Sequence, residues 1–188
     1  MTQLAAAAVA DLAAMHAAAA AAGLTVTAGA GWPETDADAE VKPLAGFIES
    51  TFSPLLAEVA GRALRRRPEP NAADRVTAII AVTALGDVTS AVHVARAVDS
   101  GQRVGPLLFF QSVPNAVAGY LAARWRLTGP IVCVGGLDAG LDIAALLIQD
   151  ADADDALVVQ VDLGTTDDDR DRAAAILVTG PADGNGTT

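Results

Sequence analysis
The chain has few cysteines, aromatic residues and basic residues, and each shortage excludes a class of protein. A single cysteine among 188 residues excludes an internal disulfide and fits a reducing cytoplasm, which is the predicted location. Aromatic residues make up only 4%, so small aliphatic side chains must fill the core. This composition favours close packing of helices on a sheet over a large ligand cavity.

Basic residues are too few to balance the acidic ones, and the formal net charge is −11. An acidic surface repels phosphate backbones, which excludes nucleic acid as an expected partner. Arginines nevertheless cluster at two places, at positions 62 and 65–67 and again at 124 and 126. The simplest interpretation is a solvated helix end whose cations complement the helix dipole.

The chain also lacks a long uninterrupted apolar run. The alanine-rich segment 5–22 is broken by Asp11 and His16, and we expect neither a signal peptide nor a membrane span. It predicts instead an N-terminal helical extension over residues 1–23, which packs on the body, packs on a partner chain, or is loosely attached. A main domain over residues 24–180 and a disordered tail over 181–188 complete the predicted organisation.

Predicted strands and helices alternate along the main domain, which indicates an α/β fold with helices on both faces of a sheet. The unbroken apolar run at 76–82 is typical of a strand covered on both sides. The last two strands are predicted to form an antiparallel hairpin at the sheet edge. The predicted strands are 24–28, 76–82, 131–134, 156–163 and 173–179. The predicted helices are 44–67, interrupted near Ser53-Pro54, and 87–98, 115–127 and 138–149. Ser53 is expected to cap a helix whose first residue is Pro54, and Asp87 is expected to cap the helix at 87–98. Residues 68–71 are expected to form a linker, and 167–172 a charged turn.

One region carries a recognisable order of motifs. The residues Ser-Val-Pro-Asn-Ala-Val-Ala-Gly occupy 112–119, Gly129-Pro130 leads into the strand 131–134, and Gly-Leu-Asp occupies 140–142. This order resembles the N-terminal half of a β-ketoacyl synthase, a member of the thiolase-like superfamily. It is most similar to short β-ketoacyl synthase N-terminal-like proteins and to chain length factors. The resemblance covers about 24–179 and implies a thiolase-like half-unit with a mixed five-stranded sheet.

The same resemblance raises a question about activity. In active ketosynthases the turn after this strand carries a nucleophilic cysteine at a helix N-terminus, and two histidines come from the C-terminal half. Counting from Gly129-Pro130 places Asp138 at the nucleophile position, whereas matching the Gly-Leu-Asp motif places Leu137 there. Neither residue forms a thioester. The histidines of this chain, His16 and His93, lie far upstream in unrelated helices.

Two residues near that turn remain candidates for chemistry. Cys133 lies inside the apolar strand, where a buried cysteine behaves as a small hydrophobe with a raised pKa. Asp138 is explained as the N-cap of the following helix, although a carboxylate there could also occupy the place of an acyl chain.

Small residues on the helix at 115–127 offer a smooth face. Asn115 is predicted to cap that helix, and the face is either ordinary core packing or a subunit contact. The interface candidates are Asn115, Ala118, Gly119 and Ala122.

The aspartates at 150, 152, 154 and 155 lack the glycine and distal glutamate of a calcium loop. They are interpreted as a solvated helix exit, and no metal or cofactor is expected.

The sequence therefore predicts a non-catalytic ketosynthase-like accessory subunit in polyketide or fatty-acid-type biosynthesis. A lone half-unit exposes an apolar helix layer, so we expect association with a second copy or with a catalytic ketosynthase. An acyl carrier protein is a further partner if a local basic patch offsets the acidic surface. The alternatives are a thioester-processing enzyme that uses Cys133 or Asp138, and a decayed fragment without a role.

Overall fold

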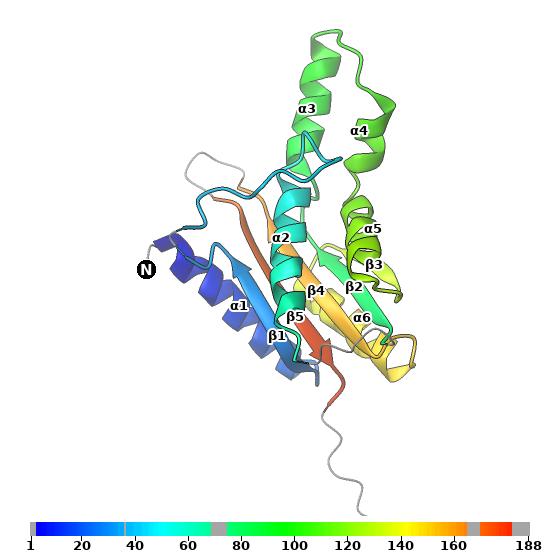
Figure 1. The fold of residues 1–188 in the computed structure, drawn as a ribbon. Coiled ribbons are helices and arrows are strands. Elements are labelled where there is room, and N and C mark those ends of the chain that lie inside the picture. The colour runs from blue at the N-terminus through cyan, green and yellow to red at the C-terminus, as the bar shows by residue number, and fades with distance from the viewer. Residues whose placement is uncertain (1–2, 36, 69–74, 165–169, 182–188) are drawn as a thin grey trace, which may run out of the picture.

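The protein, described here from a computed structural model, is built on one mixed sheet (Figure 1). Its strand order is β1-β5-β4-β2-β3, with β2, β3 and β4 parallel to one another and β5 antiparallel to both of its neighbours. The predicted mixed five-stranded sheet is therefore confirmed. The structure describes residues 3–35, 37–68, 75–164 and 170–181. The strands are β1 Thr25–Trp32, β2 Thr77–Val82, β3 Ile131–Val134, β4 Asp155–Asp162 and β5 Arg172–Thr179.

Helices cover both faces of this sheet, and each face has its own core. Helices α2 and α5 pack on one face, and α1 and α6 pack on the other. Alanine, valine, leucine and isoleucine dominate both cores, as the shortage of aromatic residues requires. The helices are α1 Gln3–Ala21, α2 Phe52–Arg65, α3 Val88–Asp99, α4 Pro106–Gln111, α5 Pro114–Trp125 and α6 Leu137–Gln149.

The N-terminal helix α1 packs on β1 and β5, so of the three placements considered it takes the one on the body. Met15 and Ala19 are buried there. The strand that follows is longer than predicted, because β1 continues through Gly29 and Gly31 to Trp32. These small residues hide the strand in the sequence, and the partner strand β5 supplies their pairing.

The segment before α2 corrects a second prediction. Residues 44–51 form turns instead of helix, and α2 begins at Phe52. Ser53 is not its cap. The Ser53 amide instead donates to the Ser50 hydroxyl at 2.8 Å. Pro54 is tolerated in the first turn of α2 because the amides of that turn have no acceptor within the helix.

The antiparallel hairpin of β4 and β5 is confirmed, but its place at the sheet edge is wrong. Strand β1 covers β5, and the outer strands are β1 and β3. Strand β2 is fully buried between β3 and β4, which explains its unbroken apolar run.

The chain between β2 and α5 leaves the body of the molecule. Figure 1 shows α3 and α4 projecting beyond the end of the sheet. Asp87 caps α3 as predicted, because its carboxylate accepts from the Ser90 amide at 3.1 Å. The short helix α4 was not predicted. We call residues 85–113 the α3–α4 arm.

Within the part of the chain that the structure describes, no helix has both the length and the hydropathy needed to cross a membrane. Most of the predicted tail, residues 182–188, lies outside the described residues. So do 69–71 of a predicted linker and 167–169 of a predicted charged turn.

Candidate functional site
The junction between β3 and α6 is where the resemblance places a nucleophile. Strand β3 ends at Val134, two glycines follow, and α6 begins at Leu137. A Cβ added at Gly135 or Gly136 would meet nothing within 4 Å, so this turn is open. Gly140, one turn into α6, packs so closely on β2 that a Cβ there would lie 2.9 Å from Val82 Cγ2. The junction thus holds the helix start against the end of the sheet.

Both candidate nucleophile positions lie in the first turn of α6. Leu137 is half-buried against the core beneath α1 and α6, and Asp138 is exposed. Asp138 is not the N-cap, which corrects the prediction; the cap is Gly136, in an extended conformation and without a side-chain hydrogen bond. The Asp138 carboxylate instead complements the positive end of the helix dipole. Neither side chain brings a thiol to the junction.

Cys133 lies on β3 but points away from this junction. It is aligned with Ala81 of β2, and its side chain packs against the core under α2 and α5. Its neighbour Val134 packs on the opposite face, as the alternation along a strand requires. Burial raises the pKa of the Cys133 thiol. The thiol is half-buried, and β3 is more exposed than the sequence indicated.

The histidines also lie outside the junction. His16 of α1 lies against Gly29 of β1, at the opposite edge of the sheet from β3. His93 of α3 is on the projecting arm, with its Nδ1 3.2 Å from a carboxylate oxygen of Glu49.

The four interface candidates on α5 occupy different environments. Asn115 is exposed in the first turn and is not the cap, because Val113 takes that place and Pro114 is the first helical residue. Ala118 is fully buried in the molecule's own core, which removes it from any outer face. Gly119 and Ala122 are half-buried at the rim. A subunit contact through Asn115, Gly119 and Ala122 stays a prediction.

Arg62 is the centre of an ionic network that the sequence did not reveal. Its guanidinium donates to both Asp38 oxygens, at 2.7 and 2.9 Å, and to Glu58 at 2.8 Å. It also lies over the Trp32 ring, 4.7 Å from the centroid. The hydrogen bonds from Arg62 hold the pKa of the Asp38 carboxyl well below its usual range.

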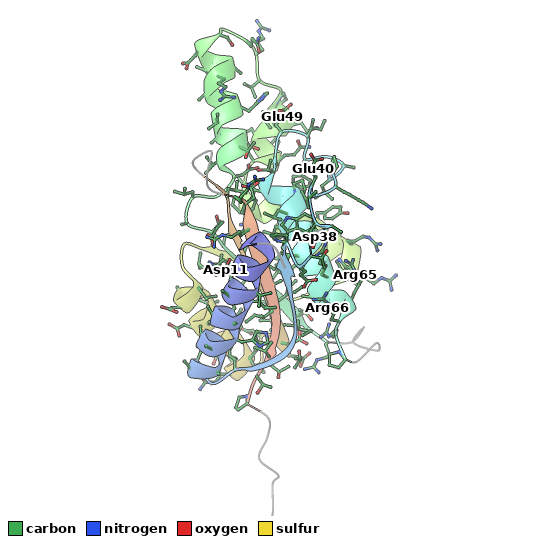
Figure 2. The ribbon with its side chains drawn as sticks, turned by 90° about the vertical axis from the view of Figure 1, so that its left-hand side faces the viewer. Asp11, Asp38, Glu40, Glu49, Arg65 and Arg66 are labelled. Atoms are coloured by element: carbon green, nitrogen blue, oxygen red, sulfur yellow. The ribbon has the colours of Figure 1, made fainter. Side chains whose placement is uncertain are left out.

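A second pair extends this network. Arg66 binds both oxygens of Glu34, at 2.6 and 2.7 Å, and the same contact lowers the pKa of Glu34. Figure 2 shows Arg65, Arg66 and Asp38 on the same side of the molecule. Carboxylates therefore bind most of the arginines that were expected to be solvated at this helix end. Among the ion-paired arginines of the cluster, Arg65 is the most accessible, with its side chain 56% exposed.

Asp150, Asp152 and Asp154 are exposed, as expected of a solvated helix exit, but Asp155 corrects that interpretation. Its side chain is 2% exposed and bound by Arg67, with Arg75 Nε at 3.3 Å. The neighbouring Asp154 carboxylate accepts from the Val76 amide at 2.7 Å, which joins β4 to the start of β2. Among the residues that the structure describes, no three acidic, histidine or cysteine side chains gather in a metal-binding arrangement.

No protein-family model and no curated protein matches the chain. Solved ketosynthase structures share its fold. One chain from the complex of the ketosynthase ApeO with its chain length factor ApeC, from Xenorhabdus doucetiae, aligns with a TM-score of 0.66 and 16% identity. That alignment covers 86% of this chain and 80% of the other.

Two further structures agree. The ishigamide ketosynthase/chain length factor aligns with a TM-score of 0.60 and 19% identity, over 78% of this chain and 48% of that one. A β-ketoacyl synthase from Burkholderia phymatum aligns with a TM-score of 0.54 and 16% identity, over 88% of this chain and 54% of that one. The chain thus spans about half the length of these two proteins, and the likeness concerns the fold.

Proposed function
Since the chain has the thiolase-like fold of the ketosynthases, we propose that it is a non-catalytic ketosynthase-like subunit. It would act in polyketide or fatty-acid-type biosynthesis in the cytoplasm, associated with a catalytic ketosynthase or with itself. The observation that carries the proposal is the first turn of α6. An otherwise well-formed helix start, packed on the sheet through Gly140, carries Leu137 and Asp138 at the positions where the sequence resemblance expects the thiol of a condensing enzyme.

The chemistry of these two residues supports a structural role for the junction. Leu137 has no lone pair or proton to offer, and its side chain packs into the core. A carboxylate such as Asp138 gives a mixed anhydride instead of a thioester when acylated, so it cannot store an acyl group for condensation. The subunit would therefore contribute shape at this position and leave acyl transfer to its partner.

The alternative of a thioester-processing enzyme has less support. Nucleophilic cysteines have lowered pKa values and an exposed thiol, whereas burial raises the pKa of Cys133. That thiol and the start of α6 also lie on opposite faces of the sheet.

We include an acyl carrier protein among the proposed partners. Carboxylates of the chain itself engage Arg62, Arg66 and Arg67, so these cations are not available to an acidic protein. Arg65 and Arg124 remain exposed and line a hollow of about 200 Å³ between α2 and α5. They are the docking residues that this partner would use.

Co-expression with the catalytic ketosynthase encoded nearest to this chain tests the proposal. We expect the two to co-purify and the product profile to change when this chain is omitted. Replacing the ketosynthase's nucleophilic cysteine should abolish condensation, whereas Cys133→Ala and Asp138→Asn should leave it unchanged. Condensation by this chain alone, or the absence of both binding and any effect on the product, would contradict the proposal.

A further inference from the structure
Positive charge gathers around the hollow between α2 and α5, although the chain as a whole carries −11. Lys42, the only lysine of the chain, lines this hollow together with Arg65 and Arg124, and all three are exposed. Neither Lys42 nor Arg124 forms an ion pair with a carboxylate of the described residues. These cations are therefore available to a ligand, unlike the arginines that the ionic network engages.

The acidic lining of the hollow does not cancel this charge. Among the described residues that line it, only Glu58 is acidic. The Glu58 carboxylate accepts from Arg62 at 2.8 Å, whereas it lies 4.0 Å from the Arg65 guanidinium. Three cations and one carboxylate give the lining a net charge of +2. Such a concentration of positive charge in an acidic protein attracts an anion.

A glycine of α2 keeps the floor of the hollow open. A Cβ added at Gly61 would lie 3.2 Å from Arg65 Nη1 and 3.6 Å from Trp125 Cζ2. An interior glycine weakens a helix relative to alanine. Here its lack of a side chain leaves open the space that the guanidinium and the indole border.

Two aromatic side chains stand beside the cations. Trp125 is half-buried, and the Arg124 guanidinium lies 5.7 Å from the centroid of its ring. Tyr120 is 37% exposed, and its ring contacts that of Phe47 edge to face at 6.3 Å. A planar ring on a ligand can pack on these aromatic groups while its anionic group binds the arginines.

The cations favour a phosphate over a carboxylate as the anionic group. Arg65 and Arg124 each offer a fork of N–H donors that matches phosphate oxygens, and Lys42 adds a point charge. A phosphate monoester carries about 1.5 to 2 negative charges at pH 7, which balances the lining, whereas a carboxylate balances half of it. The volume of about 200 Å³ lies below the roughly 300–1,000 Å³ of sites for drug-sized ligands, so the ligand is small.

We propose that the hollow between α2 and α5 is a binding site for a phosphate monoester of an aromatic ring, held by Lys42, Arg65 and Arg124. The inference goes beyond the proposed function, since it stands whether or not the chain binds a ketosynthase. It makes the ligand a competitor of the proposed acyl carrier protein, because both use Arg65 and Arg124.

Isothermal titration calorimetry of the purified full chain with phenyl phosphate at pH 7.5 tests the site. We expect binding at least tenfold tighter than that of benzoate, which has one negative charge, or of inorganic phosphate, which lacks the ring. The double variant Arg65→Gln with Arg124→Gln should lose at least tenfold in affinity. The matched control is Arg96→Gln with Arg103→Gln, which removes the same charge from exposed positions on the α3–α4 arm and should leave binding unchanged.

A second measurement needs no variant. Because Lys42 is the only lysine, acetylation by an amine-reactive ester, followed by peptide mass spectrometry, reports on this one side chain. Saturating phenyl phosphate should slow the acetylation of Lys42 at least threefold and leave that of the α-amino group unchanged.

The outcomes separate this inference from the proposed function. No binding of phenyl phosphate, equal affinity for benzoate, an equal loss in both double variants, or an unprotected Lys42 overturns the inference. Binding of phenyl phosphate by a chain that recruits no ketosynthase and changes no product leaves the inference standing and overturns the proposed function, and recruitment without phenyl phosphate binding does the reverse. A phosphotyrosine peptide identifies the source of the ester: tighter binding than phenyl phosphate assigns it to a modified protein, and weaker binding to a small molecule.

Discussion

Asp38 is the main partner of Arg62 in the ionic network and is the subject of the first prediction at the residue scale. Both Asp38 and Arg62 are largely buried, with side-chain exposures of 13% and 16%. Replacing Asp38 with Asn leaves the Arg62 guanidinium without its main partner, and we expect the free energy of unfolding at pH 7 to fall by about 2 kcal/mol.

The pH dependence of this difference follows from the sign of the pKa shift. Arg62 lowers the pKa of Asp38 in the folded state below its ordinary value of 3.8, so the unfolded state takes up the proton first as pH falls. The stabilisation is complete above the ordinary pKa and is lost as pH falls toward the folded-state pKa. Urea unfolding of wild type and Asp38→Asn should therefore converge between pH 5 and pH 2; a constant gap would contradict the assignment.

Asp155 is the most deeply buried carboxylate of an ion pair in the described structure. Asp155→Asn keeps the shape of the side chain but removes the buried carboxylate that binds Arg67. We expect a loss of about 3 kcal/mol in the free energy of unfolding, measured by urea at an unchanged slope. Asp150→Asn, at an exposed position just after α6, is the control and should change stability little. Equal effects of the two variants would contradict the account.

The start of α6 still has the electrostatics of a nucleophile site. We predict that Leu137→Cys in a Cys133→Ala background alkylates faster with iodoacetamide at pH 7.5 than the wild-type Cys133 thiol. The helix N-terminus lowers the pKa of a thiol at Leu137, whereas burial raises that of Cys133. Adding Asp138→Asn removes a neighbouring negative charge and should increase the rate again. A slower reaction at Leu137 than at Cys133 would contradict this.

Helix α6 approaches the sheet more closely than any side chain at Gly140 allows. A Cβ at that position meets Val82 at 2.9 Å and Ile80 at 3.3 Å, so Gly140→Ala should cost about 1–3 kcal/mol by overpacking. Gly119 on α5 has no atom within 4 Å of an added Cβ, and Gly119→Ala should stabilise the helix by about 1 kcal/mol. Thermal unfolding of the pair should show opposite signs; two stabilising substitutions would contradict the close packing of α6.

At the same scale, local sequence patterns predict elements well and their ends less well. The apolar run of β2, the strand β3 and the helix α6 follow directly from periodicity. The three wrong caps, at Ser53, Asn115 and Asp138, arise because backbone turns at Thr51, Val113 and Gly136 begin these helices without a side-chain cap. The preference of proline for the first helical position applies to Pro114, where Asn115 was predicted as the cap, but it misplaces Pro54, which follows two earlier residues of α2.

The ion pairs of the candidate site could not be predicted, because they join residues that are far apart in the sequence. Arg62 and Asp38 are 24 residues apart, and Arg67 and Asp155 are 88 apart. No local pattern links such pairs, so a run of arginines and a run of aspartates were each interpreted as solvated. Helix α4 was missed for a related reason, because an exposed apolar helix violates the periodicity that marks a helix packed on its own core.

At the scale of the whole molecule, the fold and the absence of a thiol at the α6 start lead to opposite expectations. The scaffold is that of a condensing enzyme, whereas the residues at its expected centre cannot carry an acyl group. The proposed role as a binding subunit is consistent with both observations.

The central claim is that this subunit does not itself carry an acyl chain. The most direct test incubates the purified chain with an acyl thioester and a malonyl thioester, followed by intact-protein mass spectrometry and analysis of the products. We predict an unmodified protein mass and no new carbon–carbon bond. An acyl adduct on residues 133–138, together with a condensation product formed by this chain alone, would contradict it.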